Sequence, residues 1–146
     1  MFNNPEDKAL KSLLSTARTI AVVGLSDKPQ RDSHRVAKYL QEQGYRIIPV
    51  NPVLKEVLGE AAYPDLASVP VPVDIVNIFR RSEEVPGVVD AALANTPPEA
   101  IWMQLGVVNE EAAKAAVSRG VTVVMDRCIK VEHGRLLGGA PGGERT

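Results

Sequence analysis

The first residues with recognisable binding chemistry follow the apolar run TIAVVG at Thr19–Gly24. A polar loop comes next, and an amphipathic pattern from Ser33 to Gln43 then predicts a helix. The unpaired N–H groups at the start of a helix carry roughly half a positive charge and therefore favour a phosphate group. The loop and the helix start also supply hydroxyl, ammonium and guanidinium donors, which are Ser26, Lys28, Arg31, Ser33 and Arg35. Together these residues predict an anion site.

The same loop lacks the pattern of the common nucleotide-binding motifs. The dinucleotide motif G-x-G-x-x-G, counted from Gly24, would need glycines where Ser26 and Pro29 stand. The acidic residue expected about 20 positions further on is replaced by Asn51 and Pro52. No G-x-x-x-x-G-K-[ST] motif occurs in the sequence. Binding of NAD and hydrolysis of ATP are therefore not expected.

A second basic group follows two later apolar runs. It consists of Lys55, Arg80 and Arg81. Two separated basic groups suit a ligand with a pyrophosphate and a detached monophosphate, the first at the helix start and the second near Lys55 or Arg80. The two arginines could instead pair with Glu83 and Glu84 on the next helix. We expect Arg80 to contact the ligand and Arg81 to be structural.

Five short apolar runs alternate with helical patterns, which predicts an α/β fold. The runs are Thr19–Gly24, Tyr45–Val50, Asp74–Phe79, Ala100–Leu105 and Val121–Asp126. Their continuous apolar character is typical of parallel strands that are covered on both faces. Helices are predicted at Pro5–Thr16, Ser33–Gln43, Ser82–Asn95 and Asn109–Arg119, and a crossover with one helical turn at Pro52–Val73. We predict a Rossmann-like, doubly wound, mainly parallel five-stranded sheet of order 3-2-1-4-5 with helices on both faces.

In such a sheet the ligand lies beyond the carboxyl ends of the strands, where the winding reverses. With the predicted order, this point lies between the first and the fourth strand. The segments expected at this edge are Leu25–Arg31, Val50–Lys55, Phe79–Ser82 and Gln104–Val107.

Length and composition are those of a single globular domain. We assign this domain to residues 1–137 and a flexible glycine-rich tail to 138–146. The net charge of −1 does not favour general binding to nucleic acid or to a membrane. Cys128 is the single cysteine, and no apolar run approaches the ~20 residues that span a bilayer. With a polar, acid-containing amino terminus, these features predict a cytoplasmic protein.

Several motifs together resemble one known family. They are IAVVGLSDKPQRDSHRVAKYL, GYRIIPVNP, VDIVNIFRR, IWMQLGVVNEEA and VMDRCIKVEH, and they extend from about Leu10 to Leu136. The chain is similar to the small CoA-binding proteins of bacteria and archaea, which are stand-alone relatives of the amino-terminal domain of the succinyl-CoA synthetase alpha subunit. The resemblance implies a Rossmann-like fold that binds coenzyme A or acyl-CoA.

The resemblance also implies where coenzyme A is contacted. Pyrophosphate contacts are expected from the loop after the first strand, adenosine contacts around Val50, Asn51 and Pro52, and further contacts after the third strand. With Arg31 and Lys55 added from the two basic groups, the candidate binding residues are Gly24, Leu25, Ser26, Lys28, Arg31, Val50, Asn51, Pro52, Lys55, Phe79 and Arg80. In the synthetase a histidine in a second domain performs the chemistry, so the resemblance implies binding without ligase activity.

Two alternatives stay open beside pure binding. The first is an enzyme that handles acyl-CoA through Cys128 or through a group supplied by a partner. The second is an interaction module that responds to CoA by binding another protein or a second copy of the chain. Cys128 is otherwise expected to be a small buried side chain. The histidines, the cysteine and the acidic residues show no metal-ligand spacing.

Overall fold

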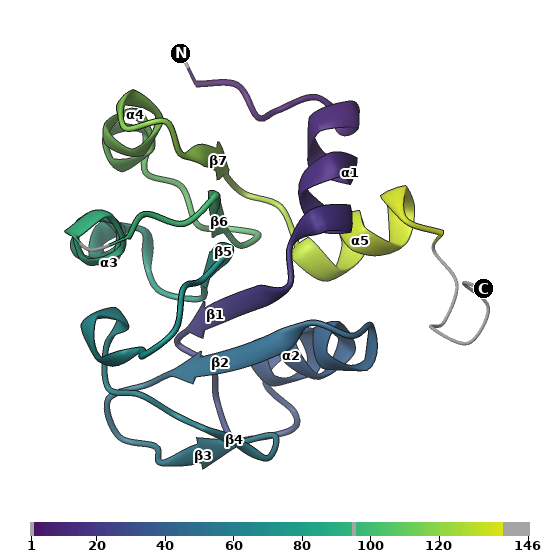
Figure 1. Ribbon diagram of the computed structural model, residues 1–146, viewed down its shortest axis with the longest axis vertical. Helices are drawn as coiled ribbons and strands as arrows, with labels where there is room; N and C mark the ends of the chain where they lie inside the picture. Colours follow the sequence, from purple (N-terminus) through teal and green to yellow (C-terminus); the bar gives the residue numbers. More distant parts are fainter. Residues whose placement is uncertain (1, 95, 139–146) are drawn as a thin grey trace.

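A parallel sheet of five strands forms the centre of the protein (Figure 1). The computed structural model describes residues 2–94 and 96–138. The order across the sheet is β2, β1, β5, β6, β7, with bounds Arg46–Val50, Thr19–Val23, Ile75–Ile78, Ala100–Met103 and Thr122–Val124. All four strand pairs are parallel. A separate antiparallel pair is formed by β3 at Glu56–Val57 and β4 at Glu60–Ala61.

Helices cover both faces of the sheet (Figure 1). One face carries α1, α2 and α5, which span Asp7–Thr16, Asp32–Glu42 and Ile129–Leu136. The other carries α3 and α4, at Val85–Ala94 and Glu110–Ser118. Short 3₁₀ turns occur at Leu66–Ser68 (η1) and Ser82–Glu84 (η2). The α/β Rossmann-like fold with a doubly wound, five-stranded parallel sheet is therefore confirmed, as is the single helical turn in the crossover.

The hydrophobic core is divided by the sheet, because alternate residues of each strand point to opposite faces. In β1, Ile20 and Val22 pack with α1, α2 and α5, whereas Ala21 and Val23 pack with α3 and α4. The same alternation occurs in β6, where Trp102 belongs to the first group. Burial on both faces explains why these strands have continuous apolar sequences.

The predicted strand order 3-2-1-4-5 is wrong. The third of the predicted strands, β5, pairs with β1 and not with β2, so the order of the same five strands is 2-1-3-4-5. The outer edge of β2 contains Pro49, which has no N–H to donate to a further strand. Tyr63 bonds to this edge, through its N–H to the carbonyl of Pro49 at 3.0 Å and its carbonyl to the N–H of Asn51 at 2.9 Å.

The start of β5 is attached to β1 by a side chain. The Oδ2 of Asp74 accepts hydrogen bonds from the backbone N–H groups of Arg18 at 2.8 Å and Thr19 at 3.0 Å. The N–H of Asp74 also donates to the carbonyl of Thr19 at 2.9 Å. These bonds position β5 beside β1, so the loops after both strands lie next to each other.

The helix boundaries differ from the predicted ones in two instructive places. Asn109 caps α4 by accepting from the N–H of Ala112 at 2.9 Å. Ser33, the first residue of the predicted helix, lies inside α2, and its Oγ accepts from the N–H of Ser26 at 3.0 Å. The helix α5 and the β3–β4 pair were not predicted. The predicted tail at 138–146 lies, apart from residue 138, outside the described residues.

Ion pairs attach α5 to α1. The guanidinium of Arg135 lies 2.8 Å from Asp7 and 2.6 Å from Glu132. The hydrogen bond from Arg135 holds the pKa of the Asp7 carboxyl below its usual value. This arrangement fixes the orientation of α5, whose first residues face the carboxyl edge of the sheet. In the described part of the chain, no helix is long and apolar enough to cross a membrane.

Candidate binding site at the carboxyl edge of the sheet

The winding of the sheet reverses between β1 and β5. The chain passes from β1 to β2 on one side and then crosses back to place β5, β6 and β7 on the other. The reversal therefore lies between the first and third predicted strands, and not between the first and fourth as the predicted order required. Consequently the loops that begin at Gly24 and Phe79 lie side by side, at the position where doubly wound proteins bind their ligands.

Gly24 permits the close approach of these two loops. Its φ is +90°, which side chains other than glycine rarely adopt, and a Cβ built there would lie 2.3 Å from the carbonyl oxygen of Phe79. Its N–H donates to the carbonyl of Val50 at 2.9 Å. Gly24 thus joins the ends of the three strands that surround the reversal.

The loop after Gly24 is folded over the first turn of α2 by local hydrogen bonds. The N–H of Lys28 donates to Ser26 Oγ at 3.0 Å, and the Nδ1 of His34 donates to the Ser26 carbonyl at 2.9 Å. With the bond between the Ser26 N–H and Ser33, these contacts hold the loop in one shape. A first hollow of about 580 Å³ lies beside it, lined by Gly24, Ser26, Lys28, Gln30, Arg31, Asp32, Ser33 and Phe79.

A second hollow of about 220 Å³ lies at the ends of β1 and β2 and against α3. Its wall is mainly apolar, with Arg80 and two acids at its sides. The lining residues are Val23, Val50, Pro52, Pro64, Asp65, Leu66, Arg80, Glu84, Gly87, Val88 and Ala91.

A third hollow of about 580 Å³ lies between the start of α2, the loop after β6 and the start of α5. It shares Asp32 and Phe79 with the first hollow and Arg80 with the second. Its other lining residues are Arg35, Val36, Arg81, Gln104, Leu105, Val107, Cys128, Lys130 and Val131. The shared residues make the three hollows adjacent parts of one surface along the carboxyl edge.

The cations at this surface differ in their partners. Arg80 Nε lies 2.7 Å from Glu84, and Arg81 lies 2.8 Å from the other oxygen of the same carboxylate. Hydrogen bonds from Arg81 and then Arg80 hold the pKa of Glu84 below its usual value. Arg35 is paired with Asp32. Among the described residues, Lys28 and Arg31 form no ion pair with an acid, and both line the first hollow.

The structure brings most of the predicted binding residues to these hollows. Gly24, Ser26, Lys28, Arg31, Val50, Pro52, Phe79 and Arg80 line them. The side chain of Leu25 is 0% exposed and belongs to the core, so only its backbone could meet a ligand. The side chain of Asn51 stabilises the loop after β1, because its Nδ2 donates to the Leu25 carbonyl at 3.1 Å. Lys55 is exposed and does not line any of the three hollows.

Several lining residues were not among the predicted binding residues. Gln104 and Val107 lie on a segment that the fold argument assigned to this edge, and both line the third hollow. The start of α5 contributes Cys128, Lys130 and Val131 to the third hollow. These residues could be placed at the site only if the helix α5 had been predicted. Asp65 comes from the irregular segment before η1, for which the sequence has no periodic signal.

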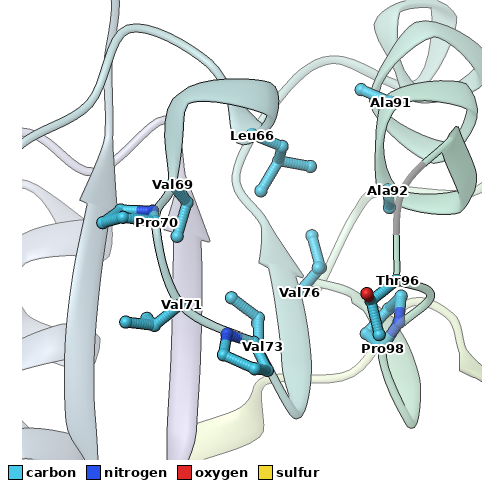
Figure 2. A pocket seen from close by; sticks show the side chains of 11 residues that line it. Leu66, Val69, Pro70, Val71, Val73, Val76, Ala91, Ala92, Thr96 and Pro98 are labelled. Carbon is cyan, nitrogen blue, oxygen red and sulfur yellow. The ribbon is translucent and has the colours of Figure 1, made fainter.

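Two further features of the described residues concern other kinds of site. A separate hollow of about 330 Å³ lies between the segment 66–73 and α3 (Figure 2), and none of the described residues that line it is charged. Within residues 2–94 and 96–138, no group of three or more histidine, cysteine or acidic side chains could hold a metal ion.

The fold and the reversal point define the chain as a Rossmann-like α/β protein. The family described as "CoA binding domain" matches residues 18–134. That match covers most of the chain, so the protein belongs to this CoA-binding domain family, and the family expected from the motifs is confirmed.

Three relatives illustrate the similarity. The Bacillus subtilis protein YneT is 50% identical over 132 residues, which is 90% of this chain and 97% of that protein. A hypothetical protein from Pyrococcus horikoshii has a TM-score of 0.89 at 35% identity, and the match covers 94% of this chain and 99% of that one. The alpha subunit of the ADP-forming acetate–CoA ligase II of Pyrococcus furiosus is 32% identical over 101 residues, which is 68% of this chain but only 19% of that subunit.

Proposed function

We propose that the protein binds coenzyme A or an acyl-CoA along the carboxyl edge of its sheet. The pyrophosphate lies in the first hollow, against the start of α2 and the side chains of Lys28 and Arg31. The adenosine lies in the second hollow, against Val50 and Pro52. The pantetheine arm enters the third hollow past Phe79.

The single observation that carries this proposal is the first hollow. It combines a helix start, a glycine whose Cβ position is blocked by backbone, and two cations that form no ion pair with a described acid. These features fit a pyrophosphate group closely approached by the main chain. The family membership supports the identity of the ligand.

The detached 3′-phosphate of coenzyme A requires a second cation. Arg80 lies where the second and third hollows meet, and its Nε is held by Glu84. This pairing orients the guanidinium while leaving its terminal nitrogens for a phosphate. Lys55 is exposed beyond β2 and is the other candidate for this contact.

The proposal is for binding without ligase chemistry. The chain matches a fifth of the acetate–CoA ligase subunit, and the ligase activity is named for that protein. The three hollows contain no histidine among their lining residues. We propose a cytoplasmic location, where a single unpaired thiol stays reduced and coenzyme A is available.

Calorimetric titration with four ligands tests the proposal. Coenzyme A is expected to bind more tightly than NAD or ADP, because only coenzyme A supplies all three parts. Dephospho-CoA should bind about tenfold more weakly than coenzyme A, since one charge-assisted contact is lost.

Two variants assign the second cation. Arg80→Met and Lys55→Met each remove one candidate, and the variant that abolishes the difference between coenzyme A and dephospho-CoA identifies the partner. Equal affinities of the unaltered protein for both ligands would remove the second basic group from the account. Equal affinities for coenzyme A and NAD would contradict the proposed function itself.

A further inference from the structure

Cys128 lies at the point where the third hollow meets α5. It is the residue that precedes the helix, its thiol is free and half-buried, and it lines the hollow. The adjoining Ile129 is 0% exposed and belongs to the core, so the backbone that carries the thiol is firmly held. The backbone of Cys128 is therefore held in place at the wall of the hollow.

A second side chain points independently to a ligand in the same hollow. Gln104 is 6% exposed, and its Oε1 accepts from the Asn77 Nδ2 and from the N–H of Ile129, each at 3.3 Å. Because the N–H of Ile129 can only donate, the oxygen must face it, and this fixes the orientation of the amide. The Nε2 of Gln104 consequently has no partner among the described residues, although it lines the hollow.

An amide donor that faces the hollow and has no protein partner can donate to an acceptor on a bound ligand. The walls around Gln104 and Cys128 are formed by Val107, Val131 and the exposed Leu105, and Lys130 stands at the edge. A flexible arm with amide carbonyls and an apolar stem fits this lining. The pantetheine arm of coenzyme A has this composition and ends in a sulfur atom.

The geometry points to a mixed disulfide between Cys128 Sγ and the sulfur of coenzyme A, as a covalent form of the proposed complex; this inference rests on the proposed function. The reaction is thiol–disulfide exchange with the disulfide of coenzyme A. The Cys128 thiol loses its proton to solvent, and its sulfur attacks one sulfur of the ligand. The bond between the two coenzyme A sulfurs breaks, and the second coenzyme A leaves as a thiolate that takes up a proton. The disulfide supplies the oxidising equivalents, so no other oxidant is needed.

Acyl transfer to the same thiol is less well supported. Attack on a thioester requires donors for the developing oxyanion and a base for the thiol proton. The third hollow offers the Gln104 amide, and no histidine lines it. Exchange between sulfurs also proceeds through the thiolate, but it needs no donors for a developing oxyanion.

Intact-protein mass spectrometry of the full chain tests the inference. Incubation with the disulfide of coenzyme A should add the mass of one coenzyme A less two hydrogens, and a thiol reductant should remove it. The reaction should be about a hundredfold faster than with glutathione disulfide at equal concentration, because bound ligand is held beside the thiol. In urea, where the hollow is lost, the two rates should become similar.

Two variants separate this inference from the proposed function. Cys128→Ser should form no adduct, and calorimetry of this variant with reduced coenzyme A distinguishes loss of the thiol from loss of the binding site. Gln104→Leu should slow the exchange with coenzyme A disulfide more than the exchange with glutathione disulfide. If reduced coenzyme A binds but its disulfide reacts no faster than glutathione disulfide, the inference is overturned and the binding function stands. If reduced coenzyme A does not bind, the proposed function fails first.

Mass gain from an acyl-CoA, with release of free thiol and no reaction with the disulfide, would establish acyl transfer instead.

Discussion

Replacing Gly24 by alanine is expected to lower the free energy of unfolding by about 3 kcal/mol and to abolish coenzyme A binding. The φ of +90° strains any residue with a Cβ, and here the added carbon would also lie 2.3 Å from the Phe79 carbonyl oxygen. Backbone cannot yield as a flexible side chain does, so the loops after β1 and β5 must separate. Denaturant unfolding and calorimetry below the unfolding transition measure the two effects.

Gly120→Ala is the matched control for this change. Gly120 has a φ of +82°, but a Cβ there would meet nothing within 4 Å. Only the conformational strain is introduced, and a loss of about 1 kcal/mol with unchanged affinity is expected. If Gly24→Ala resembled this control in both stability and binding, the close contact between the two loops would not matter for the site.

Replacing Ser26 by glutamate is expected to weaken coenzyme A binding by more than about a hundredfold while unfolding stays cooperative. The side chain of Ser26 lines the first hollow beside the start of α2. A carboxylate there would repel the pyrophosphate and would compete with it for Lys28 and Arg31. Calorimetry measures the affinity, and thermal unfolding verifies the fold.

Two controls identify the cause of this loss. Ser12→Glu adds the same charge on the exposed side of α1 and should leave the affinity unchanged. Ser26→Ala removes the Oγ that accepts from the Lys28 N–H, without adding charge, and should have only a moderate effect. Near-normal binding by Ser26→Glu would mean that the pyrophosphate lies elsewhere.

The five strands could be predicted because burial on both faces leaves an uninterrupted apolar run in the sequence. The order of the strands in the sheet could also have been predicted, because Pro49 lies in the second strand. A proline within the second run marks that strand as an edge, which excludes a further strand beyond it. The prediction that the third strand lies beside the second ignored this signal.

The first hollow was predictable because all of its lining residues except Phe79 lie within ten residues of Gly24. The third hollow was not, since its wall is assembled from the starts of α2 and α5 and the loop after β6. The helix α5 is short, and the run that precedes it resembles the end of a strand. The pairing of Arg80 with Glu84 was foreseen as an alternative to ligand contact, and in the structure it orients a side chain that still lines the site.

A crystal structure of the protein with coenzyme A tests the central claim most directly. We expect density for the pyrophosphate between Ser26 and the first turn of α2, for the adenine against Val50 and Pro52, and for the ligand sulfur near Cys128. Ordered coenzyme A bound only on another surface, with the first hollow filled by solvent, would contradict it.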